Sequence, residues 1–173
     1  MNRSLFRILP LLLLTLFSTT LQFWALDAQS LWYDEGFSVW LSQKPVSEII
    51  AITAADIQPP LYYLLLHGWI RLTGQSEWAL RFFSAFFAVL AVPLMWQVAR
   101  RLLKQRAAAD VAALLVALSP LWLWYGREVR NYSLGLALLL AAAWYLLPLL
   151  KEHRQKEIRG KNCGLYSLSR RIA

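Results

Sequence analysis

The chain has little charge, and the charge it has is unevenly divided. Only 16% of its 173 residues are charged, with 10 acidic residues against 18 basic ones and a formal net charge of +8. A typical soluble domain has about 25% charged residues. Because 58% of the residues are hydrophobic, a core of this size could not bury them all. The composition excludes a disordered chain and argues against a conventional soluble enzyme.

Cysteine is nearly absent as well. Cys163 is the single cysteine, so the chain cannot form an internal disulfide or supply a cysteine-rich zinc site. Its seven glycines exclude a collagen-like repeat.

The chain does contain four long apolar runs. A membrane-spanning helix needs roughly 20 mostly apolar residues, and the runs cover about 8–26, 82–99, 107–125 and 132–150. Only the third contains a charge, Asp110, near its start. The first run could be a cleaved signal peptide, but a signal core has about 7–15 residues, so we favour an uncleaved helix. The sequence predicts an all-α polytopic membrane protein with four transmembrane helices.

The distribution of charge predicts the orientation of these helices. If residues 59–73 do not span the membrane, the segments on one side of it hold 13 basic and three acidic residues. The segments on the other side hold five basic and seven acidic residues. The positive-inside rule then places both termini in the cytoplasm, with an outer loop over 27–81 and a basic tail over 151–173. The basic surplus is thus an orientation signal, and we expect no nucleic-acid partner.

The outer loop is expected to be an ordered cap on the membrane. Residues 31–42 have apolar positions at helical spacing, and Pro45 opens a second short helical pattern. Residues 59–73 are expected to form an interfacial helix, with Tyr62, Tyr63 and Trp69 at the level of the lipid headgroups.

Acids and arginines meet on the predicted outer side. Carboxylates can serve as a general base or hold a divalent cation, and arginine matches phosphate oxygens. Each acid also has a simpler explanation. Asp34 and Glu35 could stabilise the N-terminal end of a helix, and Asp56 could be a turn residue. Glu128 could form a surface ion pair with Arg127 or Arg130. His67 could likewise be a packing residue. The acids on this side are Asp34, Glu35, Asp56 and Glu128, and the nearby arginines are Arg127 and Arg130.

Three stretches resemble one enzyme family. They are LWYDEGFS at 31–38, DIQPPLYYLLLHGWIRLTGQSEWALRFFSA at 56–85 and SPLWLWYGREVRNYSL at 119–134. In this order they resemble the polyprenyl-phosphate-dependent membrane glycosyltransferases, and more narrowly the family 39 group of protein O-mannosyltransferases and aminoarabinose transferases. The resemblance covers most of residues 3–150.

The resemblance implies transfer of a hexose or pentose from a polyprenyl-phosphate donor to an acceptor on the outer face of the membrane. It implies a catalytic role for Asp34, Glu35 and Glu128. Substrate-binding candidates are Asp56, Arg127, Arg130, Tyr62 and His67. Gln58 stands where relatives often have histidine, so a metal site there is not assigned and the cofactor is unknown. The resemblance also suggests that the protein lies in a bacterial inner membrane, with membrane lipid as a partner.

Relatives of this type have more spans than four. The sequence is therefore expected to be an N-terminal part or a truncated product, and it is expected to need a complementary chain for activity. The competing hypothesis is a non-catalytic polytopic membrane protein, either a remnant or an assembly subunit. A transporter is less favoured, because no run has a charge at mid-depth.

Overall fold

The computed structural model describes residues 3–56 and 58–172, which form eight helices and no strand in that part of the chain. The predicted all-α class is confirmed. The helices are α1 (Arg3–Phe23), α2 (Tyr33–Ser42), α3 (Val46–Ala55), α4 (Pro60–Thr73), α5 (Glu77–Leu103), α6 (Arg106–Leu118), α7 (Pro120–Tyr125) and α8 (Tyr132–Ile172).

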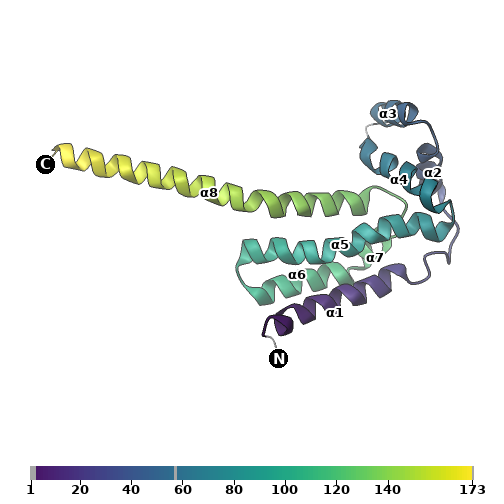
Figure 1. Ribbon diagram of the computed structural model, residues 1–173, viewed down its shortest axis with the longest axis horizontal. Helices are drawn as coiled ribbons and strands as arrows, with labels where there is room; N and C mark the ends of the chain where they lie inside the picture. Colours follow the sequence, from purple (N-terminus) through teal and green to yellow (C-terminus); the bar gives the residue numbers. More distant parts are fainter. Residues whose placement is uncertain (1–2, 57, 173) are drawn as a thin grey trace.

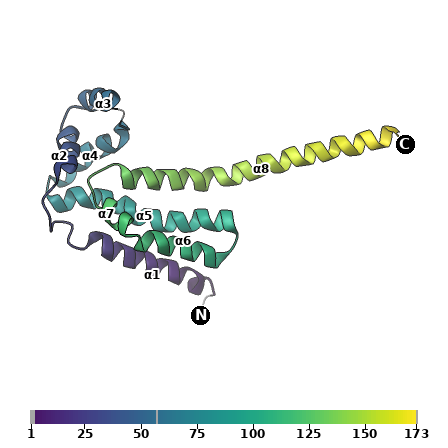
Figure 2. The same ribbon diagram turned by 180° about the vertical axis from the view of Figure 1, so that it is seen from behind.

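Helix α5 is the centre of a bundle that includes α1, α6 and the first half of α8 (Figures 1 and 2). Small side chains allow the close packing of α5 and α6. Ala109, Ala113 and Ala117 recur every fourth residue on α6 and are fully buried, and Ala113 and Ala117 pack in one cluster with the buried Val92 of α5. Small residues at such a contact let two helix backbones approach closely, as in membrane-embedded bundles.

The third predicted span, 107–125, is broken in two. Helix α6 ends at Leu118 and α7 begins at Pro120, with Ser119 in an extended conformation between them. Proline disfavours the helical conformation of the residue before it, and Ser119 caps α7 by accepting a hydrogen bond from the Trp122 amide at 3.3 Å. The break follows from the Ser-Pro pair.

Within the described part of the chain, two helices are long and apolar enough to cross a membrane, over Glu77–Leu103 and Tyr132–Arg154. Ile8–Phe23 in α1 is apolar but shorter, and α6 has 13 residues because of the break at Ser119. The structure therefore supports two of the four predicted spans by length and composition.

Helices α2, α3 and α4 form a cap at one end of the bundle (Figure 1). The prediction that the aromatic side chains of α4 lie at the headgroup level is wrong for Tyr62 and Tyr63, which are 1% and 0% exposed. They pack in a core with Leu41 of α2 and Ile49 of α3. The α4 aromatics thus join the cap to the bundle, because Tyr62 also contacts Phe83 of α5.

The predicted basic tail is a continuation of the fourth helix. Helix α8 runs without interruption from Tyr132 to Ile172 and projects far beyond the other helices (Figures 1 and 2). An ion pair of 2.7 Å between Lys156 and Glu152, one helical turn apart, supports the helix after its apolar part ends.

Candidate functional site

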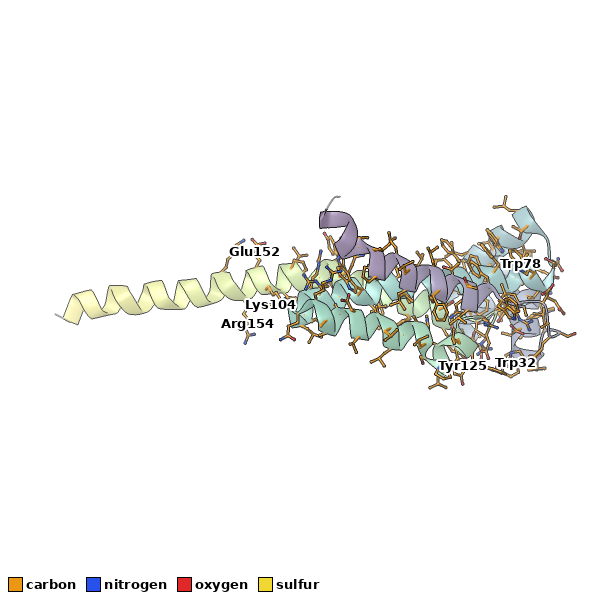
Figure 3. The ribbon with its side chains drawn as sticks, turned by 90° about the horizontal axis from the view of Figure 1, so that it is seen from below. Trp32, Trp78, Lys104, Tyr125, Glu152 and Arg154 are labelled. Atoms are coloured by element: carbon orange, nitrogen blue, oxygen red, sulfur yellow. The ribbon has the colours of Figure 1, made fainter. Side chains whose placement is uncertain are left out.

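The acids and arginines singled out in the sequence lie at the capped end of the bundle. Figure 3 shows Trp32, Trp78 and Tyr125 at this end, and Lys104 with Glu152 and Arg154 toward the other. The cap, the start of α5 and the α7–α8 connection meet here (Figures 1 and 2). Parts of the chain that are far apart in the sequence therefore lie together at this end.

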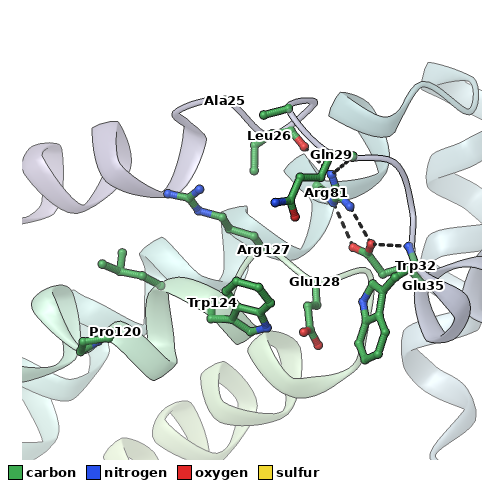
Figure 4. A pocket seen from close by; sticks show the side chains of 12 residues that line it. Ala25, Leu26, Gln29, Trp32, Glu35, Arg81, Pro120, Trp124, Arg127 and Glu128 are labelled. Carbon is green, nitrogen blue, oxygen red and sulfur yellow. Dashed lines mark hydrogen bonds and ion pairs between the residues drawn. The ribbon is translucent and has the colours of Figure 1, made fainter.

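A cavity of about 470 Å³ lies at this meeting point (Figure 4). Its walls come from the segment after α1, the start of α2, the beginning of α5, and α7 with the residues that follow it. The charged and aromatic side chains in the wall are Trp32, Glu35, Arg81, Trp124, Arg127 and Glu128.

Glu35 and Arg81 form a buried ion pair at the cavity wall (Figure 4). Arg81 donates from Nε to one Glu35 oxygen at 3.0 Å and from Nη2 to the other at 2.7 Å. The same carboxylate accepts from the amides of Val129 at 3.1 Å and Trp32 at 3.3 Å. A carboxylate has about four lone-pair positions, so these four donors occupy the Glu35 side chain.

Arg81 is equally occupied by the chain that leaves α1. Its guanidinium donates to the carbonyls of Leu26 at 2.8 Å, Gln29 at 2.5 Å and Ser30 at 3.2 Å. With the two bonds to Glu35, all five guanidinium donors have acceptors. The pair therefore ties together the α1–α2 connection, α2, α5 and the α7–α8 connection.

Sequence reasoning did not select Arg81 as a site residue. Its partner lies 46 positions away, so no local pattern joins the two. A signal was available, because Arg81 immediately precedes the uncharged run 82–99 and a charge at that depth needs a partner.

Asp34, the residue next to Glu35, has a different environment. Its side chain is 39% exposed, and its Oδ2 lies 3.4 Å from Nη1 of Arg130. Arg130 also donates to the hydroxyl of Tyr132 at 3.5 Å. Asp34 thus presents a reachable carboxylate beside an arginine, whereas the Glu35 carboxylate is enclosed.

Glu128 is buried and lines the cavity. Burial raises the pKa of its carboxyl, against an opposing effect from a hydrogen bond with the Trp124 side chain. The simpler explanation of Glu128 as an exposed surface ion pair is wrong, because the side chain is 7% exposed and Arg130 pairs with Asp34.

Arg127 lines the cavity from the opposite side to Glu35 (Figure 4). It donates to the carbonyl of Leu21 at the end of α1. Burial lowers the pKa of its guanidinium, and its buried Nε has no hydrogen-bond partner within the described residues. Arg127 is thus a cationic side chain of the cavity wall whose Nε is enclosed and unsatisfied.

Five of the eight predicted site residues do not line this cavity: Asp34 and Arg130, which pair beside it, and His67, Tyr62 and Asp56. His67 is buried in the cap, with Nδ1 2.7 Å from the Ser42 carbonyl, and Tyr62 bonds to the Ser84 hydroxyl at 2.7 Å. Asp56 ends α3 and accepts a bond of 2.9 Å from Gln58, which in turn accepts from Tyr63. The expectation that His67 is a packing residue fits this position.

A second cavity, of about 440 Å³, lies between α7 and the start of α8. It is lined by Ser119, Leu121, Trp122, Tyr125 and Tyr132. Tyr132 brings its polar end next to Arg130, whose guanidinium carbon lies 5.6 Å from the centre of the Tyr132 ring. Helix α7 therefore has one cavity on each side, and the pair of Asp34 and Arg130 lies near its end.

No cluster of three or more histidine, cysteine or acidic side chains suited to a metal ion occurs within residues 3–56 and 58–172. The sequence left the cofactor open, and these residues alone assemble no such site.

Comparison with known proteins gives one match. No curated protein and no solved structure matches the chain. The family described as dolichyl-phosphate-mannose-protein mannosyltransferase matches residues 57–160, which is more than half of the sequence. The matched part contains Arg81, Glu128 and Arg130, and it confirms the resemblance seen in the sequence. The chain is a membrane protein and belongs to this glycosyltransferase family.

Proposed function

We propose that the chain takes part in the transfer of a sugar from a polyprenyl-phosphate donor to an acceptor hydroxyl, at the outer face of a bacterial inner membrane. The observation that supports this most is the contrast between two adjacent acids. Glu35 is fully bonded, whereas Asp34 is accessible and lies 3.4 Å from Arg130. A carboxylate that can act as a base, Asp34, therefore lies next to an arginine that can bind phosphate, Arg130.

In this proposal Asp34 is the general base. The acceptor oxygen forms a bond to the anomeric carbon of the sugar, and the bond from that carbon to the phosphate oxygen of the donor breaks. Asp34 takes the proton of the acceptor hydroxyl, and the polyprenyl phosphate leaves with the bonding electrons. Arg130 stabilises the negative charge that develops on the leaving phosphate.

We assign Glu35 and Arg81 a positioning role. The four donors on the Glu35 carboxylate leave it no lone pair with which to take a proton. Instead the pair fixes the start of α2, which holds Asp34, against the connection that holds Arg130. Such support keeps catalytic groups at the geometry that the reaction needs.

The two cavities beside α7 have different characters and suit different parts of the substrates. The α7–α8 cavity is lined mainly by apolar and aromatic side chains, as a lipid tail requires, and one of them, Tyr132, contacts Arg130, which could bind the phosphate head. The cavity lined by Glu35 and Glu128 also has Trp32, Trp124 and Arg127 in its wall, which supply the aromatic and polar groups that a sugar or acceptor requires. We place the polyprenyl chain in the first and the sugar or acceptor in the second.

The finer topology is part of the same proposal. We propose four crossings, by α1, α5, α6 with α7, and α8, with both termini in the cytoplasm. Residues 106–125 together would extend about 30 Å at 1.5 Å per residue, which matches the bilayer core despite the break at Ser119. Residues 1–150 would then form the membrane region and 151–173 its cytoplasmic extension.

Transfer measured in native membranes tests the function. Membranes containing the full chain are given polyprenyl-phosphate mannose with a radiolabelled sugar and an acceptor peptide rich in serine and threonine. We expect labelled peptide with the wild-type chain and a loss of at least about 100-fold with Asp34→Asn, in line with removal of a general base. Asp27→Asn, a carboxylate change in the same outer loop, is the control. Equal transfer with and without the chain would favour the non-catalytic alternative.

A further inference from the structure

A third cavity lies at the other end of the bundle and has no part in the proposed transfer reaction. It has a volume of about 420 Å³ and lies between α1 and α6. Its walls are apolar side chains such as Leu11 and Leu14 of α1 and Val111 and Leu114 of α6. Val111 and Leu114 are 53% and 43% exposed, so the cavity is a groove open on the outside of the bundle.

One end of this groove is polar. Trp96 of α5 donates from Nε1 to Oδ1 of Asp110 at 2.7 Å, and both residues line the groove. Oδ2 of Asp110 lies 3.6 Å from Nε of Arg106, one turn earlier on α6. The Asp110 charge is thus compensated by Arg106.

Arg100 stands at this end of the groove. Its guanidinium carbon lies 5.7 Å from the centre of the Trp96 ring, one helical turn from it on α5. The adjacent Arg101 turns to the other side of α5, where it lies 4.1 Å over the Trp144 ring and bonds to the Trp144 carbonyl on α8. Arg100 therefore lies against Trp96, a residue of the groove wall, whereas Arg101 lies against Trp144 of α8.

The basic surroundings extend beyond Arg100. Lys104 is exposed at the α5–α6 turn, where Figure 3 shows it far from Trp32 and Tyr125. An apolar groove that opens sideways and ends at cationic side chains has the chemistry of a phospholipid: acyl chain along the groove and phosphate at the arginine.

We propose that this groove binds one acyl chain of an anionic membrane phospholipid, with its phosphate held by Arg100 and Lys104. The site is independent of the proposed transfer reaction, because it lies at the end of the bundle opposite Asp34. Charge complementarity selects the occupant: the exposed lining is apolar, and the cations at the groove end require an anionic head.

Photolabelling of the purified full chain in lipid nanodiscs tests this proposal. The probe is phosphatidylglycerol with a photoreactive group in one acyl chain, and the labelled residues are mapped by peptide mass spectrometry. We expect labelling of residues 10–17 and 110–114, and at least a fivefold loss with Arg100→Gln. Val111→Trp, which fills the groove, should give the same loss. Arg154→Gln, which removes a charge elsewhere near this end, should leave labelling unchanged.

Several results would overturn the proposal. One is full labelling of these residues in both Arg100→Gln and Val111→Trp. Another is an equal loss in Arg154→Gln, which would indicate a general effect of charge on lipid near the membrane. A diacylglycerol probe with the same photoreactive chain but no phosphate should label these residues several-fold less. Equal labelling by the two probes would remove the role of Arg100.

Discussion

At the scale of single residues, two neighbours on one helix have separate environments. Asp34 and Glu35 both lie in the first turn of α2, where negative charge is favourable. Successive helical side chains point about 100° apart, so one faces the buried Arg81 and the other faces Arg130 near the surface. Adjacent acids in a motif therefore need not share a chemical role.

The buried pair is expected to govern stability. Glu35→Gln leaves Arg81 without its ionic partner in a buried place, and removal of one partner of a buried pair costs about 3–5 kcal/mol. We expect a clearly lower melting temperature in detergent, whereas Asp34→Asn should unfold at the wild-type temperature because Asp34 is 39% exposed. Glu35→Leu combined with Arg81→Met should recover part of the loss. A wild-type melting temperature for Glu35→Gln would contradict the positioning role.

Glu128 makes stability depend on pH. Burial raises the pKa of its carboxyl in the folded chain above the value in the unfolded chain. The folded state therefore binds the proton more tightly, and its stability declines as pH rises from about 4.5 through the raised pKa. Glu128→Gln, which cannot ionise, should lack this decline. Melting temperatures from pH 4 to 8 measure it, and parallel curves for the two chains would refute the assignment.

Much of the site could be predicted from the sequence, although its pairings could not. The motifs that contain Asp34, Glu35, Glu128 and Arg130 indicated which residues converge at one end. Nothing local to Glu35 indicates that its carboxylate is used by Arg81, because that contact depends on how α5 packs against α2. The burial of Tyr62 and Glu128 also depends on packing between distant elements, which hydropathy alone does not report.

At the scale of elements, a glycine determines how closely three helices meet. A Cβ added at Gly126 would lie 2.6 Å from the Trp122 carbonyl oxygen, 2.8 Å from Cβ of Ala88 and 2.9 Å from Nε2 of Gln22. Residues of α1, α5 and α7 therefore leave no room for a side chain at the end of α7.

Gly126→Ala is expected to destabilise the fold by about 1–3 kcal/mol, as overpacking of a close contact typically does. Gly68→Ala is the matched control. Gly68 is inside α4 with no atom within 4 Å of an added Cβ, so alanine should be neutral or stabilising there. Thermal unfolding of both variants measures the difference. Equal melting temperatures for the two would mean that the α1–α5–α7 junction is looser than described.

The helical elements were the most predictable part of the fold. Apolar runs and the proline at 45 marked helices that the structure contains. The exceptions have local causes, since Ser119 and Pro120 divide the third run and the good helix formers after Leu150 extend the fourth.

At the scale of the whole molecule, α8 offers a large uncovered apolar surface. Only 22% of its apolar window is buried, against 44% for α5. Leu139, Tyr145 and Leu150 are each 65% exposed on it. We propose that the complementary chain expected from the sequence packs on this surface.

We expect the purified chain alone to transfer sugar much more slowly than native membranes that contain it. A photoreactive amino acid at position 139 should form an adduct with a second protein chain in native membranes, and the same group at exposed Ser47 of the cap should not. Full activity of the purified chain, with lipid as the sole adduct at position 139, would show that no complementary chain is needed.

The proposed transfer reaction requires that the capped end, with Asp34 and Arg130, faces the outside of the cell. Labelling of single cysteines tests it most directly, in a chain whose native cysteine is removed by Cys163→Ala. Ser47→Cys lies on the exposed face of the cap and Lys104→Cys at the opposite end of the bundle. We expect a membrane-impermeant maleimide to label position 47 in intact cells and position 104 only after permeabilisation. Labelling of position 104 but not position 47 in intact cells would contradict it.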